Sequence, residues 1–190
     1  MERVMSAPNL LTLLRIFLIP AIVIIFYLPG KFGHTLAAAV FGLAALTDFI
    51  DGYLARNLHQ ETRFGAFLDP VADKLVVSVA LVLIVAEIGK FYIAIPAAVI
   101  ICREITISAL REWMSEFGKK TSMAVNYMGK VKTFLQMVAI GILLYYCPRC
   151  ENNHVYFILG LILLYIAAGM TLWSMYSYLK VAWPDLTKGE

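Results

Sequence analysis

Six long apolar stretches, separated by short polar or glycine- and proline-containing breaks, constrain this chain more than any other feature. They cover residues 10–28, 35–58, 67–86, 91–114, 126–146 and 154–179. Each is close to the roughly 20 residues that a helix needs to cross the hydrocarbon core of a bilayer. With 61% hydrophobic and 15% charged residues, a soluble domain of 190 residues could not bury this much apolar surface. We therefore expect an all-α integral membrane protein with six transmembrane helices.

The distribution of lysine and arginine predicts how these helices are oriented. If both termini lie in the cytoplasm, the outer connections carry only Lys31, Lys90 and Arg149, and most other basic residues lie on the inner side. This is the asymmetry that the positive-inside rule describes, and an even number of spans agrees with it. We expect one multi-pass domain over residues 1–190, with room for a short interfacial helix over residues 1–8.

Four aspartates lie inside predicted spans, and they are the strongest functional signal in the sequence. Asp48 and Asp51 lie near the inner end of the second span, and Asp69 and Asp73 near the inner start of the third. Antiparallel helices would bring all four to one depth, and residues four apart share a helix face. Ionisable groups in a span need a partner or a cavity, and four carboxylates together need cations between them. Oxygen-only ligands favour Mg²⁺ or Mn²⁺, and two such ions suit phosphoryl transfer.

Two alternatives to a metal site remain open from the residues alone. The aspartates could form ion pairs with Lys74, Arg56 or Arg103 and only hold the bundle together, although four carboxylates exceed what that role requires. They could also relay ions in a small cation transporter. A relay predicts carboxylates spread across the bilayer, whereas these cluster at one end.

The aspartates belong to a longer motif with fixed spacing. It reads Asp48-Phe-Ile-Asp51-Gly52-Tyr-Leu-Ala55-Arg56, followed by Gly65, Asp69 and Asp73. The motif resembles the signature of the CDP-alcohol phosphatidyltransferases at every fixed position. Similar text at residues 62–74, 103–114 and 129–133 extends the resemblance over nearly the whole chain.

The resemblance implies transfer of the phosphatidyl group of CDP-diacylglycerol to sn-glycerol 3-phosphate, giving phosphatidylglycerophosphate and CMP. It implies two divalent ions, Mg²⁺ or Mn²⁺, held by Asp48, Asp51, Asp69 and Asp73. Asp73 is the candidate base for the attacking hydroxyl, although neighbouring cations lower the basicity of a carboxylate. A related enzyme that uses serine or inositol phosphate as acceptor is the nearest alternative.

The same resemblance implies a homodimer among membrane lipids of the bacterial inner membrane. The positive-inside distribution predicts both termini, and with them the active site, on the cytoplasmic side. The net charge of +3 gives no reason to expect a nucleic acid partner. The nucleotide-binding residues would be Asp48, Gly52, Ala55, Arg56, Gly65, Asn9 and Thr12. Two other roles explain the polar residues of the first span equally well. Asn9 would cap the helix, and Arg15 would snorkel toward the interface.

Basic residues in the second half of the chain are candidates for holding the acceptor phosphate. Arg103 and Arg111 lie about 80° apart on one helix face, and guanidinium groups match phosphate oxygens. Lys130 is the third candidate. The alternatives are ion pairs, of Arg103 with a motif aspartate and of Arg111 with Glu104 or a lipid headgroup. Lys132, about 200° from Lys130, is interpreted as a positive-inside anchor.

We predict no metal-binding or redox role for the three cysteines. Cys147 and Cys150 have CxxC spacing, but there is no second pair for zinc and no βαβ pattern for a thioredoxin-like site. An outward-facing connection would permit a disulfide, but we expect incidental cysteines here. Cys102 is predicted to pack inside the bundle.

Overall fold

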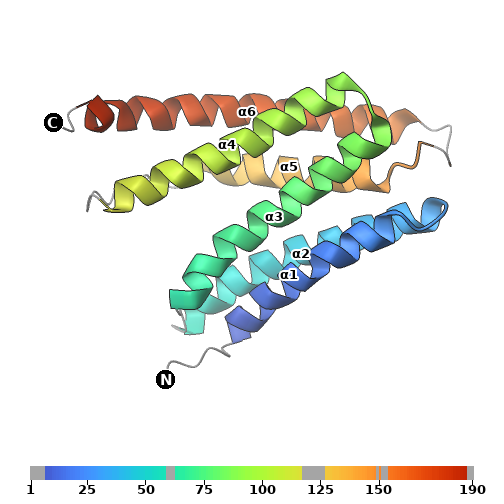
Figure 1. Cartoon of the computed structure of the whole chain (residues 1–190), viewed down its shortest axis with the longest axis horizontal. Helices are drawn as coiled ribbons and strands as arrows, with labels where there is room; N and C mark the ends of the chain where they lie inside the picture. The colour runs from blue at the N-terminus through green and yellow to red at the C-terminus, as the bar shows by residue number, and fades with distance from the viewer. Residues whose placement is uncertain (1–6, 59–62, 117–126, 149, 151–153, 188–190) are drawn as a thin grey trace.

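The computed structural model describes residues 7–58, 63–116, 127–148, 150 and 154–187 (Figure 1). Within these ranges no side chain is described at 7–9, 48–58, 63–64, 66–67, 111, 114–116, 127–130, 178, 181–182 and 184–187. The described residues form six α-helices and no strand. They are α1 (Ala7–Phe26), α2 (Lys31–Leu58), α3 (Arg63–Ile88), α4 (Phe91–Glu116), α5 (Tyr127–Tyr145) and α6 (His154–Thr187).

Each predicted apolar stretch is a helix, so the all-α class is confirmed. The largest differences are at the ends, where α2 and α3 each begin four residues earlier than predicted and α6 continues to Thr187. Hydropathy marks the part of a helix that is apolar, whereas backbone hydrogen bonding continues into flanking polar residues. The helices therefore extend further at their ends than the hydropathy pattern indicates.

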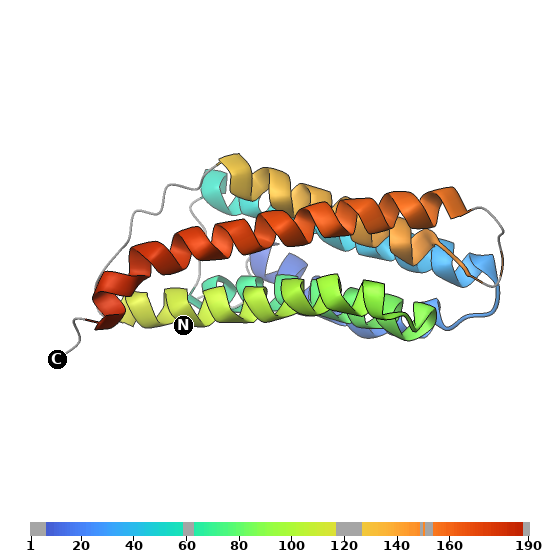
Figure 2. The ribbon, with the colours of Figure 1, turned by 90° about the horizontal axis from the view of Figure 1, so that it is seen from above.

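The helices run up and down the length of the bundle, and a short turn joins α1 to α2 and α3 to α4 as antiparallel pairs. Gly30 between α1 and α2 (φ 78°) and Gly89 between α3 and α4 (φ 62°) adopt the left-handed conformation that glycine reaches without steric cost. Figures 1 and 2 show these two turns at one end, together with the end of α5 and the start of α6. The start of α1 and the end of α6 both lie toward the other end, as an even number of passes requires.

Apolar side chains fill the interior and also cover the outside. Large buried ones are Ile22, Phe41, Leu81, Ile84, Ile93, Ile100, Ile140, Leu143, Leu144 and Leu164. Exposed ones include Phe17, Phe32, Phe91, Phe134, Val155, Ile162, Trp173, Tyr176 and Trp183. Exposure on this scale is unusual for a monomer in water and is expected where the solvent is lipid.

Two helical segments in the described part of the chain are long and apolar enough to cross a membrane by length and composition. They are Phe91–Leu110 and His154–Ser177. Three shorter apolar segments are Leu10–Phe26, Lys31–Thr47 and Val131–Tyr145. These ranges cover only described side chains, which in α2 extend to Thr47. Six spans therefore stay a prediction.

Helices α5 and α6 approach closely at Gly160. A Cβ atom added there would lie 2.7 Å from Cγ and 2.8 Å from Cδ2 of Leu143 on α5. Small residues let transmembrane helices approach to this distance. The contact fixes the register between α5 and α6.

The cysteines differ from the prediction. A disulfide bond joins Cys147 and Cys150 in the connection after α5. The backbone makes the bond feasible because the N–H of Cys150 donates to the carbonyl of Cys147 (3.2 Å), which turns the two residues toward each other. Cys102 is exposed on α4 rather than packed in the bundle.

Candidate active site

Two motif aspartates on α3 face α1. Asp69 accepts a hydrogen bond at Oδ1 from the hydroxyl of Thr12, and Asp73 accepts one at Oδ1 from Nη1 of Arg15. Thr12 and Arg15 are three residues apart on α1, and their partners are four apart on α3. Matching i, i+3 and i, i+4 spacings therefore bring the four side chains together where the helices touch.

Arg15 does not snorkel to the interface, so that interpretation is wrong. Its side chain is only 1% exposed, while that of Asp73 is 37% exposed. A buried guanidinium beside a half-exposed carboxylate leaves the aspartate accessible from one side. Arg15, the ion-pair partner of Asp73 in the described part of the chain, was not among the cations that the ion-pair alternative considered.

The other motif residues are placed only by their backbone. Asp48, Asp51, Gly52, Ala55 and Arg56 lie in the last turns of α2, which ends at the same end of the bundle where α3 begins (Figure 1). Because α2 and α3 run antiparallel, residues 48 and 51 are level with about residues 73 and 70. The side chains of these five residues, and of Asn9, lie outside the described residues.

Gly65 is buried within the first turn of α3. The motif is thus brought together at one end of the bundle at the level of the backbone, whereas the arrangement of four carboxylates around ions stays a prediction.

The described carboxylates suit a divalent ion in donor type. Oxygen ligands are what Mg²⁺ and Mn²⁺ prefer. The described side chains contain no cluster of three or more metal-ligating groups, so Asp69 and Asp73 can supply only part of a coordination shell. Each already accepts a bond at Oδ1 from α1, and this orients the carboxylate.

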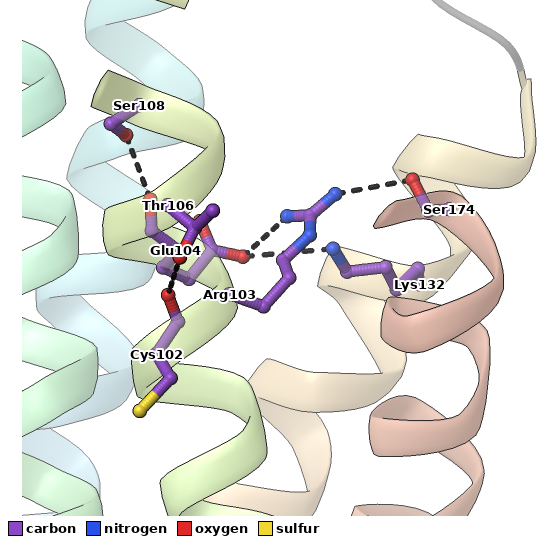
Figure 3. Close-up of polar contacts among 7 residues, drawn as sticks. All are labelled: Cys102, Arg103, Glu104, Thr106, Ser108, Lys132 and Ser174. Carbon is purple, nitrogen blue, oxygen red and sulfur yellow. Dashed lines mark hydrogen bonds and ion pairs between the residues drawn. The ribbon is translucent and has the colours of Figure 1, made fainter. Parts of the chain in front are cut away.

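A second polar group lies between α4, α5 and α6, and we call it the basic cluster (Figure 3). Its members are Arg103, Glu104, Lys132 and Ser174. Nη1 of Arg103 donates to Oε1 of Glu104 at 2.8 Å, and Nη2 donates to the hydroxyl of Ser174 at 3.1 Å. Nζ of Lys132 lies 3.6 Å from the same glutamate oxygen.

The basic cluster changes the interpretation of two residues. Lys132 is 3% exposed and ion-paired, so it is not the surface anchor that we predicted. Arg103 is buried, and it pairs with its neighbour Glu104 and not with a motif aspartate. The inward face of α5 was visible in the sequence, because the polar residues Lys132 and Gln136 precede buried Ala139 and Leu143 at helical spacing.

Arg111 and Lys130 belong to α4 and α5, but their side chains lie outside the described residues. The described pair of cations is therefore Arg103 and Lys132. Counted over its described side chains alone, the basic cluster carries two positive charges and one negative charge, that of Glu104.

The basic cluster and the carboxylates lie toward the same end of the bundle. Helices α3 and α4 form a hairpin around residues 89–90, so Arg103 is level with about residue 76. This is about one helical turn deeper than Asp73. One end of the bundle thus holds two charged groups. Asp69 and Asp73, which we call the acidic centre, lie between α1 and α3, and the basic cluster lies between α4, α5 and α6.

Comparison with known proteins identifies the class. The sequence profile of the CDP-alcohol phosphatidyltransferase family matches residues 5–173. The chain belongs to this family.

Individual relatives are similar over almost their whole length. A protein of Shigella flexneri serotype 5b (strain 8401) is 51% identical over 181 residues, which cover 95% of this chain and 97% of that protein. A protein of Pseudomonas fluorescens is 52% identical over 183 residues, 96% of this chain and 92% of its own. One of Salmonella choleraesuis (strain SC-B67) is 50% identical over 181 residues, with 95% and 97% covered. All three are named CDP-diacylglycerol--glycerol-3-phosphate 3-phosphatidyltransferase.

Proposed function

We propose that this protein transfers the phosphatidyl group of CDP-diacylglycerol to sn-glycerol 3-phosphate, giving phosphatidylglycerophosphate and CMP. One observation carries the proposal: relatives that are 50–52% identical over nearly both full lengths bear the name of this activity. In this reaction a hydroxyl oxygen of glycerol 3-phosphate forms a bond to the phosphatidyl phosphorus. The bond from that phosphorus to CMP breaks, and the hydroxyl proton passes to a base.

The acidic centre would handle the pyrophosphate. Asp48, Asp51, Asp69 and Asp73 would hold two divalent ions, Mg²⁺ or Mn²⁺, which bind the pyrophosphate and offset the charge that develops on CMP. Thr12 and Arg15 keep the two α3 carboxylates in place from α1. The half-exposed Asp73 is the residue we assign to the attacking hydroxyl, as its orienting group or its base.

The nucleotide would lie beside this centre, along the small residues Gly52, Ala55 and Gly65 and the side chains of Arg56, Asn9 and Thr12. Buried Gly65 and the fully buried Thr12 belong to α3 and α1, the two helices that carry the acidic centre. A backbone without bulky side chains at these positions lets a ligand approach the helix closely.

The basic cluster would bind the phosphate of the acceptor. Arg103 and Lys132 are two cations with one carboxylate, Glu104, among the described side chains, and a phosphate dianion is an anion that both would attract. Arg111 and Lys130 are further candidates for the same phosphate. An acceptor without phosphate, such as serine, would leave this charge unmatched, so the cluster favours a phosphorylated alcohol.

We also propose that all six helices span the bacterial inner membrane, with both termini and the active site on the cytoplasmic side. Two features support this. Apolar side chains cover the outside of the bundle, and the start of α1 and the end of α6 lie toward the same end of it (Figure 1). CDP-diacylglycerol would then reach the acidic centre from the surrounding lipid while its cytidine stays in water. Homodimer formation is part of the proposal.

Release of CMP by the purified protein tests the proposed function. The protein in detergent is given CDP-diacylglycerol and one acceptor at a time: sn-glycerol 3-phosphate, serine or inositol phosphate. We expect CMP and a new lipid with glycerol 3-phosphate alone. A lipid formed from serine but not from glycerol 3-phosphate would overturn the assignment, and cation flux into proteoliposomes without CMP release would favour the transporter.

A further inference from the structure

Glu104 is the shared partner of both buried cations in the basic cluster (Figure 3). Its Oε1 accepts from Arg103 at 2.8 Å and lies 3.6 Å from Nζ of Lys132. On the far side of the guanidinium, Ser174 accepts from Nη2 at 3.1 Å. The head group of Arg103 is therefore held from α4 and α6, and the ammonium of Lys132 is directed toward the same carboxylate from α5.

The guanidinium of Arg103 keeps binding capacity in spite of these contacts. Arginine has five N–H donors, and its hydrogen bonds to Glu104 and Ser174 use one from each terminal nitrogen. Its Nε is buried and has no hydrogen-bond partner among the described residues. Buried donors are normally satisfied, so an unused one next to excess positive charge indicates a place for an anion with several oxygens.

We propose that Glu104 is a positioning residue, which fixes the charged groups of Arg103 and Lys132 at the spacing that receives the acceptor phosphate. This inference rests on the proposed function. Two cations without a carboxylate between them would repel each other and would be costly to bury. With Glu104 in place they are arranged before the substrate arrives, so binding needs little rearrangement.

The kinetic signature follows from the charges. Replacing Glu104 by glutamine keeps the shape of the side chain but makes the net charge of the basic cluster more positive by one unit. Attraction for a phosphate dianion then stays the same or grows, so KM for glycerol 3-phosphate is not raised. The cations are no longer fixed, so the hydroxyl is less well placed and kcat falls by about tenfold or more.

The experiment compares Glu104→Gln, Glu104→Asp and Ser174→Ala with two matched controls. Glu87→Gln removes the same charge near the opposite end of the bundle, and Ser177→Ala removes a hydroxyl that bonds its own helix at the carbonyl of Trp173. For each variant, kcat, KM for both substrates and the melting temperature in detergent are measured. We expect a lower kcat with unraised KM for glycerol 3-phosphate in Glu104→Gln, a smaller effect of the same kind in Ser174→Ala, and partial recovery in Glu104→Asp.

Three results would overturn the inference. They are unchanged kinetics in Glu104→Gln, a raised KM for glycerol 3-phosphate with kcat retained, and KM values for both substrates that shift together with the melting temperature. If Glu104→Gln does not fold, the Ser174→Ala and Glu104→Asp kinetics decide by the same criteria. Wild-type protein that releases no CMP with glycerol 3-phosphate refutes the proposed function itself, whereas an active wild type with unaltered variants refutes this inference alone.

Discussion

Replacing Gly160 with alanine should destabilise the bundle where α5 and α6 touch. The added Cβ would lie 2.7 Å from Cγ and 2.8 Å from Cδ2 of Leu143, and 3.3 Å from Cγ2 of Ile142. Carbon atoms in favourable contact are about 3.5–4.0 Å apart, so the helices or the leucine must move by about 1 Å. Leu143 is fully buried, so its side chain cannot relieve the clash by turning outward from the bundle.

The size of the effect follows from two opposing contributions. Overpacking of a close-packed interior costs about 1–3 kcal/mol. Alanine in place of glycine within a helix contributes about 1 kcal/mol in the other direction. Gly169→Ala on the same helix is the matched control, because no atom lies within 4 Å of its added Cβ and only the favourable contribution remains. The two variants should therefore differ in free energy of unfolding by about 1–3 kcal/mol.

Thermal unfolding of both variants in the same detergent, followed by circular dichroism, measures this difference. A difference of about 1–3 kcal/mol corresponds to a melting temperature several degrees lower for Gly160→Ala than for Gly169→Ala. Adding Leu143→Ala to each variant completes the test, since the truncation should cost less when combined with Gly160→Ala than when combined with Gly169→Ala. Equal melting temperatures for the two glycine variants would show that the close approach of α5 and α6 is wrong.

The remaining predictions concern the two centres and the disulfide. Asp69→Asn and Asp73→Asn should each lower turnover by orders of magnitude with an unchanged circular dichroism spectrum, because a charge is lost without a change in volume; activity near wild type refutes the assignment. EDTA should abolish CMP release and added Mg²⁺ or Mn²⁺ restore it, and undiminished activity in EDTA would exclude the ions. Arg15→Met should lower activity and cost about 1–3 kcal/mol in unfolding, since rehydration of half-exposed Asp73 limits the loss. After reduction, a membrane-impermeant maleimide should label the exposed Cys150 in intact cells, and labelling of Cys150 only after lysis would reverse the topology.

The helices could be predicted from the sequence because the signal is local. A run of apolar residues long enough to span a bilayer is helical wherever its neighbours lie, so all six elements were identified. The ends were less accurate, as the extension of α6 to Thr187 shows. A hydropathy pattern contains no information on where backbone hydrogen bonding stops.

The site could be predicted only where its residues share one helix. Asp69 and Asp73 are four apart, which is enough to place them on one face. Their partners Thr12 and Arg15 lie 57 and 58 residues away in sequence, and no pattern within one segment shows that α1 packs against α3. Lys132 was misjudged for a related reason: the positive-inside rule predicts the side of the membrane, not the rotation of the helix about its axis.

Charge compensation explains how this bundle tolerates ionisable groups among its buried apolar side chains. Arg15 neutralises Asp73 in the acidic centre, and Glu104 offsets Arg103 and Lys132 in the basic one. An uncompensated charge in an apolar interior costs several kcal/mol, so each centre is stable only with its own counterion. A phosphate that binds at the basic cluster therefore joins an arrangement that Glu104 already stabilises, and its affinity depends on the N–H donors that Arg103 does not use within the protein.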